Sequence, residues 1–320
     1  LDPEYLLDAE GNPVLDENGN PSSASTNATA TGEIIISDTT EVNGEIAVMV
    51  AVIRYADGNS YSFTTLADAV EFAKAGDTVT LLRDVSASEI IKIEKAITLD
   101  GNGKKLTVTG AYGIDVKAGV NLAINNLTVE SNLYALNLRG ASDNAEVTIT
   151  DSNLTGCIAL NVWGKNVIIN ATNSAFTSVD TTTQENYSAI ALNNNGSYSA
   201  ENTVINITGG SITALDENGA PSIAIRNATA TGVANVSDTT VVTGEIREVV
   251  SIVTYNGSDA FYSHFTLQES INRAANDPNA TVKLLKDITI SEKLVIEGNV
   301  TIDGNGKTLT YTGTDRAIDV

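Results

Sequence analysis

The sequence predicts an all-β protein, a single-stranded parallel β-helix (solenoid) in which short strands stack in successive coils. Three observations support this fold class: a sequence repeat of roughly 200 residues, a shorter recurrence of strand-like segments inside it, and the composition. Only 18% of the 320 residues are charged and 42% are hydrophobic, and the polar remainder is mostly Asn, Thr, Ser and Gly. This composition excludes long Lys- and Glu-rich helices as the main architecture, and its apolar fraction excludes a disordered chain.

The long repeat is visible as aligned identities. Residues 27–32 and 227–232 both read NATATG, and SDTTEVNGEI at 37–46 returns as SDTTVVTGEI at 237–246. Two further pairs are TVTLLRDV (78–85) with TVKLLKDI (281–288), and ITLDGNGKKLTVTG (97–110) with VTIDGNGKTLTYTG (300–313). We therefore expect the terminal coils of a preceding repeat at 1–47, a complete repeat at 48–247 and the opening part of the next at 248–320.

The shorter recurrence predicts the coils themselves. GIDVK (113–117), ALNLR (135–139) and ALNVW (159–163) are versions of one apolar–polar–apolar strand, and they start 22 and 24 residues apart. Alternation along a strand directs successive side chains to opposite faces. The residues predicted to face the core are Ile114, Val116, Leu136, Leu138, Leu160 and Val162. Asn, Gly and Asp between the strands favour turns, because they tolerate left-handed backbone angles.

One short amphipathic helix is expected in each repeat. Thr65 precedes an apolar face that begins at Leu66, and Thr266 with Glu269 forms a Thr-x-x-Glu capping box before Leu267. The other apolar residues on the two faces are Ala69, Val70 and Ala73 in the first copy, and Ile271 and Ala274 in the second. We expect each helix to plug the apolar open end of the β-helix and to protect its unpaired edge.

The run FTTLADAVEFAKAGDTVTLLRDV (63–85), followed by ITLDGNGKKLTVTG, resembles the pectate-lyase-like β-helix adhesive domains of bacterial cell-surface proteins. The resemblance covers roughly the first 60 residues of the repeat well, and the later coils match in pattern only. It implies a right-handed parallel β-helix that is repeated along an extracellular, cell-surface protein. Such a resemblance is more informative about fold than about activity.

The same resemblance gives little support for catalysis. Pectate lyases of this fold use acidic Ca²⁺ ligands and an Arg base in an R-x-x-P-x-x-R-like setting, and no Arg here has that proline context. The related glycoside hydrolases carry Asp pairs and a His-Gly, whereas the single histidine, His264, is followed by Phe265. We therefore expect no catalytic residues, no metal site and no cofactor, with Ca²⁺ as the one ion left open.

A candidate glycan- or partner-binding face lies on the outer side of the ALNLR-type strands. One outward column reads Asp115, Asn137, Asn161, and the next reads Lys117, Arg139, Trp163 and later Arg226. The Trp could stack on a sugar ring while the amides bond hydroxyl groups and the basic residues meet acidic sugars. In the alternative interpretation, the basic residues pair with nearby Asp and Glu, and Trp163 packs under the loop near 178–188.

Charge and chain features narrow the function class. The formal charge of −22 disfavours nucleic acid and anionic membranes as partners, and no apolar stretch is long enough to span a bilayer. One cysteine, Cys157, permits no intrachain disulfide and is expected to be a buried apolar residue.

We expect a non-enzymatic extracellular module: an adhesin, a stalk or a filament element. Its partners would be further copies end to end, with 248–320 adjoining 1–47, or a host or cell-wall glycan or protein. The rivals are a carbohydrate-binding module and a polysaccharide lyase.

Overall fold

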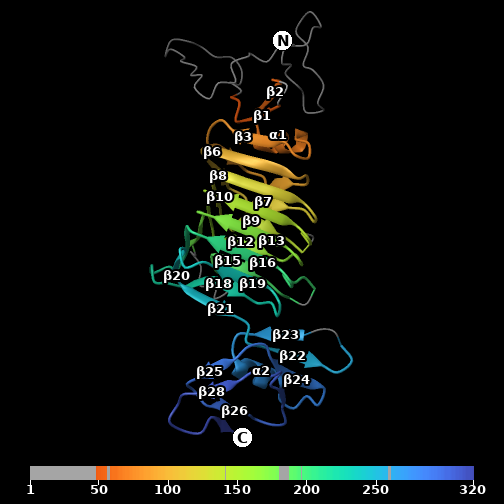
Figure 1. Ribbon diagram of the computed structural model, residues 1–320, viewed down its shortest axis with the longest axis vertical. Coiled ribbons are helices and arrows are strands. Elements are labelled where there is room, and N and C mark those ends of the chain that lie inside the picture. The colour runs from red at the N-terminus through yellow and green to blue at the C-terminus, as the bar shows by residue number, and fades with distance from the viewer. Residues whose placement is uncertain (1–47, 56–57, 141, 180–186, 196, 259–260) are drawn as a thin grey trace, which may run out of the picture.

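The computed structural model describes residues 48–55, 58–140, 142–179, 187–195, 197–258 and 261–320. It confirms the predicted fold class: an all-β solenoid of about 10 turns with parallel sheets and two short helices. Figure 1 shows the coils stacked along the long axis of an elongated molecule. The predicted terminal coils at 1–47 lie outside the described residues.

The first solenoid begins with a cap. Strand β1 (Ala51–Arg54) pairs in antiparallel fashion with β2 (Ser60–Phe63) and with β3 (Thr78–Leu81), and α1 (Leu66–Phe72) lies between β2 and β3 in the chain. The hydroxyl of Thr65 accepts the Asp68 N–H at the start of α1. Leu66, Ala69, Val70 and Ala73 are all buried in the core, as the amphipathic pattern predicted.

Below the cap, the coils add strands by parallel pairing to two long sheets, one of 14 strands that covers two faces of the solenoid and one of seven strands that forms the third. The 14-stranded sheet contains β6 (Ile97–Val108) and β8 (Asn121–Ser131), which are long enough to pass round a corner of the coil. On one side of that corner follow β10 (Glu146–Thr150), β13 (Ile168–Thr172), β16 (Val204–Thr208) and β19 (Val233–Val236). On the other side lie β4 (Val85–Ala87), β11 (Asn153–Gly156), β14 (Ala175–Val179), β17 (Ser211–Leu215) and β20 (Val241–Thr243).

The corner is built from residues in the left-handed region. Asn102, Asn126, Asp151 and Asn173 have φ of 50°, 48°, 49° and 50° in successive coils. Asn and Asp tolerate this conformation better than other residues that carry a Cβ. The predicted role of Asn and Asp in the turns is thus confirmed at this corner.

The third face is a seven-stranded parallel sheet that carries the candidate binding residues. All six residues predicted to face the core are buried. The strands are β5 (Ile91–Ile93), β7 (Tyr112–Val116), β9 (Tyr134–Leu138), β12 (Ile158–Val162), β15 (Ile190–Leu192), β18 (Ile223–Asn227) and β21 (Glu245–Glu248).

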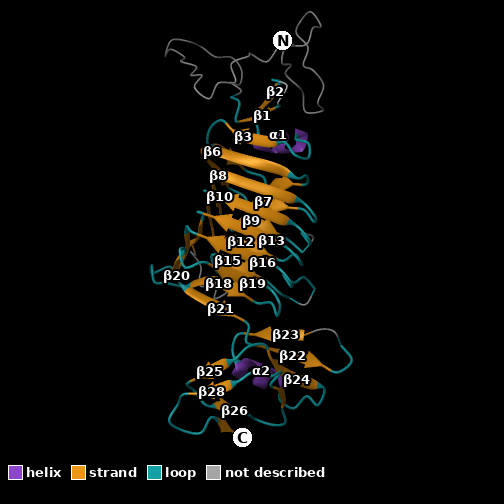
Figure 2. Cartoon of the chain, viewed as in Figure 1, coloured by secondary structure: helices purple, strands orange, loops and turns teal. Residues whose placement is uncertain are grey.

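A second cap-and-coil arrangement follows β21 (Figure 2). β22 (Ser251–Tyr255), β23 (Phe261–His264), α2 (Leu267–Ala274) and β24 (Ala280–Leu284) repeat the order and pairing of β1, β2, α1 and β3. Thr266 and Glu269 form the predicted capping box. This part has its own hydrophobic core around Val253, Ile271 and Val282. Its remaining strands are β25 (Ile288–Ile290), β26 (Leu294–Val295), β27 (Thr301–Asp303), β28 (Leu309–Tyr311) and β29 (Ile318–Asp319).

Candidate binding face

The first column of the candidate face is a hydrogen-bonded amide ladder. Parallel pairing puts Asp115, Asn137 and Asn161 opposite one another in β7, β9 and β12. The Asn137 Nδ2 donates to Asp115 Oδ1 at 2.8 Å, and Asn161 Nδ2 donates to Asn137 Oδ1 at 2.7 Å. The strand spacing of about 4.8 Å allows such bonds between like residues in neighbouring coils.

The ladder extends beyond the predicted residues and has a constant direction. Asn193 Nδ2 donates to Asn161 Oδ1 at 2.8 Å, and Arg226 Nη1 lies 3.5 Å from Asn193 Oδ1. Every amide donates toward the carboxylate of Asp115, so a cation stands at the donor end and an anion at the acceptor end. Hydrogen bonds aligned in this way polarise one another and strengthen the chain. Burial, reinforced by the neighbouring Arg247, lowers the pKa of Arg226.

Burial differs from the expectation for two members of this column. Alternation predicted that Asn137 and Asn161 point outward and meet a ligand, but each is only 1% exposed. Their amide groups are bonded to the coils above and below, and a buried amide that leaves these bonds would lose its partners. The structure therefore places Asp115, Asn137 and Asn161 together as an internal ladder within the fold.

In the second column, Lys117 and Arg139 are exposed and are paired with carboxylates. Arg226, predicted for this column, instead lies opposite Ala191 in the register and so continues the first column. Two guanidinium nitrogens of Arg139 donate to the Asp115 carboxylate, Nε to Oδ2 at 2.9 Å and Nη2 to Oδ2 at 2.6 Å. This hydrogen bonding raises the pKa of Arg139. The exposed Lys117 Nζ lies 3.7 Å from Glu94 Oε1. These pairs match the alternative interpretation, in which the basic residues bind nearby carboxylates.

Trp163, the third member of this column, is half-buried. Its backbone N–H donates to Leu138 O at 2.7 Å, which fixes the end of β12 on β9. The loop residues 180–186, under which the alternative interpretation placed the indole ring, lie outside the described residues.

Aromatic residues on the same sheet were not predicted as part of the face. The rings of Tyr112 and Tyr134 stack with centroids 5.1 Å apart, and the Arg139 guanidinium carbon lies 5.5 Å from the Tyr112 ring. Burial is the main cause that raises the pKa of Tyr134. Alignment of YGIDV with YALNL could have revealed this pair, because both strands begin with Tyr.

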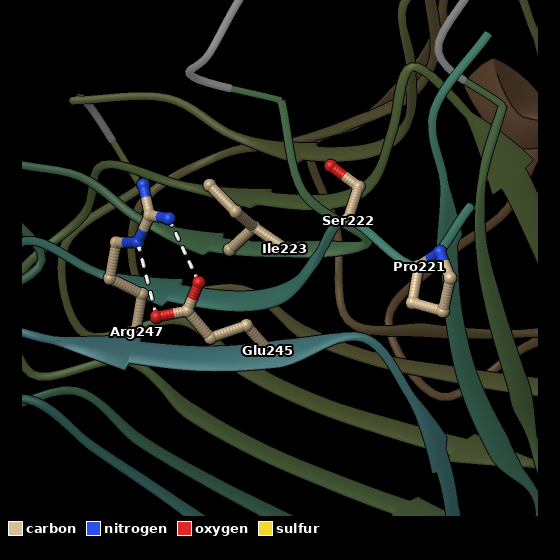
Figure 3. Close-up of a pocket in the computed structure, with 5 residues that line it drawn as sticks. All are labelled: Pro221, Ser222, Ile223, Glu245 and Arg247. Carbon is tan, nitrogen blue, oxygen red and sulfur yellow. Dashed lines mark hydrogen bonds and ion pairs between the residues drawn. The ribbon is translucent and has the colours of Figure 1, made fainter. Parts of the chain in front are cut away.

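A separate pocket of about 520 Å³ lies where β18 and β21 meet. Figure 3 shows Glu245 and Arg247 side by side on β21 and paired with each other, with Nη2–Oε2 at 2.8 Å, while Pro221, Ser222 and Ile223 also line the pocket. The two charges neutralise each other, and none of the six predicted face residues lines this pocket.

Other features of the described residues bear on chemistry. Over the described ranges, no group of three or more His, Cys, Asp or Glu side chains is placed to hold a metal ion. Cys157 is buried, as predicted, and its Sγ lies 3.1 Å from Asn132 O. Neither helix in the described part of the chain is long and apolar enough to cross a membrane.

No protein-family model, curated protein or solved structure matches the chain. The resemblance to β-helix adhesive domains therefore rests on the residues quoted for it in the sequence.

Proposed function

We propose that this chain is a non-enzymatic structural module, a rigid stalk in an extracellular cell-surface protein built of tandem repeats. The observation that carries this proposal is the second cap-and-coil arrangement, which begins three residues after β21 ends at Glu248 and repeats the element order of the first. Each coil of a solenoid contacts mainly its neighbours, so length grows by adding repeats without a new core.

The contacts between the two arrangements support a stiff joint. Asn194 Nδ2 donates to Ser263 Oγ at 3.3 Å, and the Arg226 guanidinium carbon lies 5.0 Å from the Phe265 ring. Lys286 Nζ lies 2.9 Å from Glu248 Oε2. These three contacts connect β18, β21 and a loop of the first solenoid to the second cap-and-coil arrangement, and we expect them to limit bending at the joint.

Small-angle X-ray scattering tests the stalk proposal. We expect an elongated particle, and a chain lengthened by one further copy of residues 48–247 should gain a fixed length without a change in cross-section. A double variant, Asn194→Ala with Arg226→Ala, should keep the cross-section and broaden the distribution of end-to-end distances. A particle whose maximum dimension does not increase with the added copy would contradict the proposal.

Assembly of copies end to end is a further form of the same role. High net charge opposes lateral association, so growth along the axis is the favoured direction. Light scattering over a concentration series should show a molar mass that rises with concentration, and negative-stain images should show filaments with a regular axial repeat. A constant monomer mass would exclude filaments under those conditions and leave the stalk proposal intact.

Carbohydrate binding is the second candidate function. It is favoured by the exposure of Lys117 and Arg139 and by the partial exposure of Trp163 on one sheet. On a glycan array, the double variant Trp163→Ala/Arg139→Ala should lose binding that the unchanged chain shows. Lys105→Met/Glu130→Gln removes an ion pair on a different sheet and serves as the control. Equal binding by all three proteins would exclude this face, and Ca²⁺-dependent release of unsaturated uronides would instead indicate a lyase.

A further inference from the structure

The two caps differ in one cluster of side chains. In the first cap, the Phe72 ring of α1 packs on Tyr61 and Phe63 of β2, with centroids 4.9 Å and 5.2 Å apart. Tyr55, which directly follows β1, completes this cluster through an edge contact with Tyr61. All four side chains are aromatic and uncharged, and the Tyr55 hydroxyl donates to Asp77 Oδ2 at 2.9 Å. No basic side chain belongs to this cluster.

The second cap replaces two of these rings with basic side chains. Aligned on the N-cap residues Thr65 and Thr266, Phe63 corresponds to His264 and Phe72 to Arg273. The tyrosines are kept, and Tyr255 and Tyr262 meet edge to face at 6.0 Å. The Arg273 guanidinium carbon lies 3.3 Å from the centre of the Tyr262 ring. Arg273 thus packs on the tyrosine that corresponds to Tyr61, on which Phe72 packs in the first cap.

His264 is placed where a second cation would be costly. Its Nε2 is buried and has no hydrogen-bond partner among the described residues. The charged groups that act on it are Glu269 and Arg273 of α2, of opposite sign. Its other neighbour, β22, pairs with it through Ser251 and contributes Tyr255 as its one titratable residue. A protonated ring would therefore be buried next to Arg273 with no new acceptor for its added proton.

We propose that the second cap is an acid-sensitive closure: protonation of His264 weakens the packing of α2 on β22 and β23, whereas the first cap, with Phe63 at this position, does not respond. The sequence neighbours of His264 connect this cap to the first solenoid, through Ser263 to Asn194 and through Phe265 to Arg226. Loosening of the cap on acidification therefore also loosens the joint between the two repeats.

The direction of the effect follows from the burial of His264. Burial lowers the pKa of His264 in the closed cap, so the open cap binds the proton more tightly. The cap is fully stable above the ordinary histidine pKa of about 6.5, and its stability falls as the pH drops below that value. Glu269 acts in the opposite sense, because its negative charge favours the protonated ring.

The single histidine makes a direct test possible. Because the chain has one His, its ring signals in an NMR titration belong to His264 without assignment. We expect a midpoint below that of a histidine in an unstructured peptide. In the same pH series, hydrogen–deuterium exchange should show a loss of protection in α2 that is absent from α1, after correction for intrinsic rates.

Three variants separate the effect of His264 from other causes of pH dependence. His264→Phe, which restores the first-cap residue, should abolish the pH-dependent loss of protection in α2, and His264→Phe/Arg273→Phe should give α2 the pH response of α1. Glu269→Gln should keep the pH-dependent loss of protection in α2 and make that loss larger at each pH, because it removes a negative charge that favours protonated His264. An unshifted His264 midpoint, or equal loss of protection in α1 and α2, would overturn the proposal.

Discussion

The same sequence motif occurs in two structural settings, residues 97–108 in the first solenoid and 300–311 in the second. Both contain DGNG followed by a Lys and an apolar strand. In the first, the segment is one continuous strand, β6, covered on its far side by β8. In the second, it forms the separate strands β27 and β28, and no described strand pairs with their far side.

The contacts that the DGNG turn makes within itself are the same in both settings. Asp100 Oδ1 accepts the Asn102 N–H at 2.9 Å, and Asp303 Oδ1 accepts the Asn305 N–H at 2.8 Å. Each Asn also has a positive φ, 50° and 47°. The turn therefore forms without help from the coil that follows.

Burial depends on that following coil. Leu99 is fully buried, whereas its counterpart Ile302 is 39% exposed. The same holds farther along, where Ile114 is fully buried and Ile318 is 43% exposed. A coil motif thus determines its turn and strand direction, while the next coil supplies most of its hydrophobic stabilisation.

Truncation of the inward apolar residue should give the largest difference between the two settings. Leu99→Ala should destabilise the first solenoid by about 2–5 kcal/mol, because it leaves a cavity in a closed core. Ile302→Ala should cost about 1 kcal/mol or less, because a partly exposed side chain loses less burial. Hydrogen exchange of the peptides that contain β6 and β27 measures both. Equal losses would mean that the exposure of Ile302 does not persist in solution.

Addition of a methyl group to the first glycine of the turn should give the next largest difference. A Cβ at Gly101 would lie 2.4 Å from both Asn126 O and Leu127 Cα, which are backbone atoms of the next coil. At Gly304 the nearest atom is Lys307 O of the same turn, 3.9 Å away. Gly101→Ala should therefore cost about 1–3 kcal/mol, and Gly304→Ala should be nearly neutral. Urea unfolding followed by Trp163 fluorescence reports the first variant, and exchange in β27 reports the second.

A buried and a more exposed amide ladder extend the comparison of covered and open positions. Asn161→Ala breaks a buried ladder and leaves the Oδ1 of Asn137 without its donor, so it should cost about 1–3 kcal/mol. Asn206 belongs to a more exposed ladder, in which it donates to Asn170 at 2.8 Å. Water can replace that partner, so Asn206→Ala should cost about 0.5–1 kcal/mol. The urea midpoints of the two variants decide between them, and equal shifts would mean that the buried ladder is accessible to water.

The sequence predicted the coils and caps because their signals are local. Inward residues such as Leu136 and Leu160 follow from alternation within five residues, and Thr266 with Glu269 is a four-residue motif. The burial of Asn137 was missed because alternation gives the direction of a side chain and not what covers it. Asn193 was missed for a related reason. The register partner of Asn161 in β15 is Ala191, and Asn193 reaches Asn161 from a position two residues farther along the chain.

Substitution of the second glycine of the turn should show no difference between the settings. Gly103 and Gly306 have φ of +73° and +70°, and neither has a backbone atom close enough to meet an added Cβ. The cost of alanine is then the left-handed conformation itself, about 1 kcal/mol in each copy. Exchange measurements on Gly103→Ala and Gly306→Ala should give equal losses. A larger loss at Gly103 would show that the covering coil also constrains the turn, and that the turn is less local than its hydrogen bonds indicate.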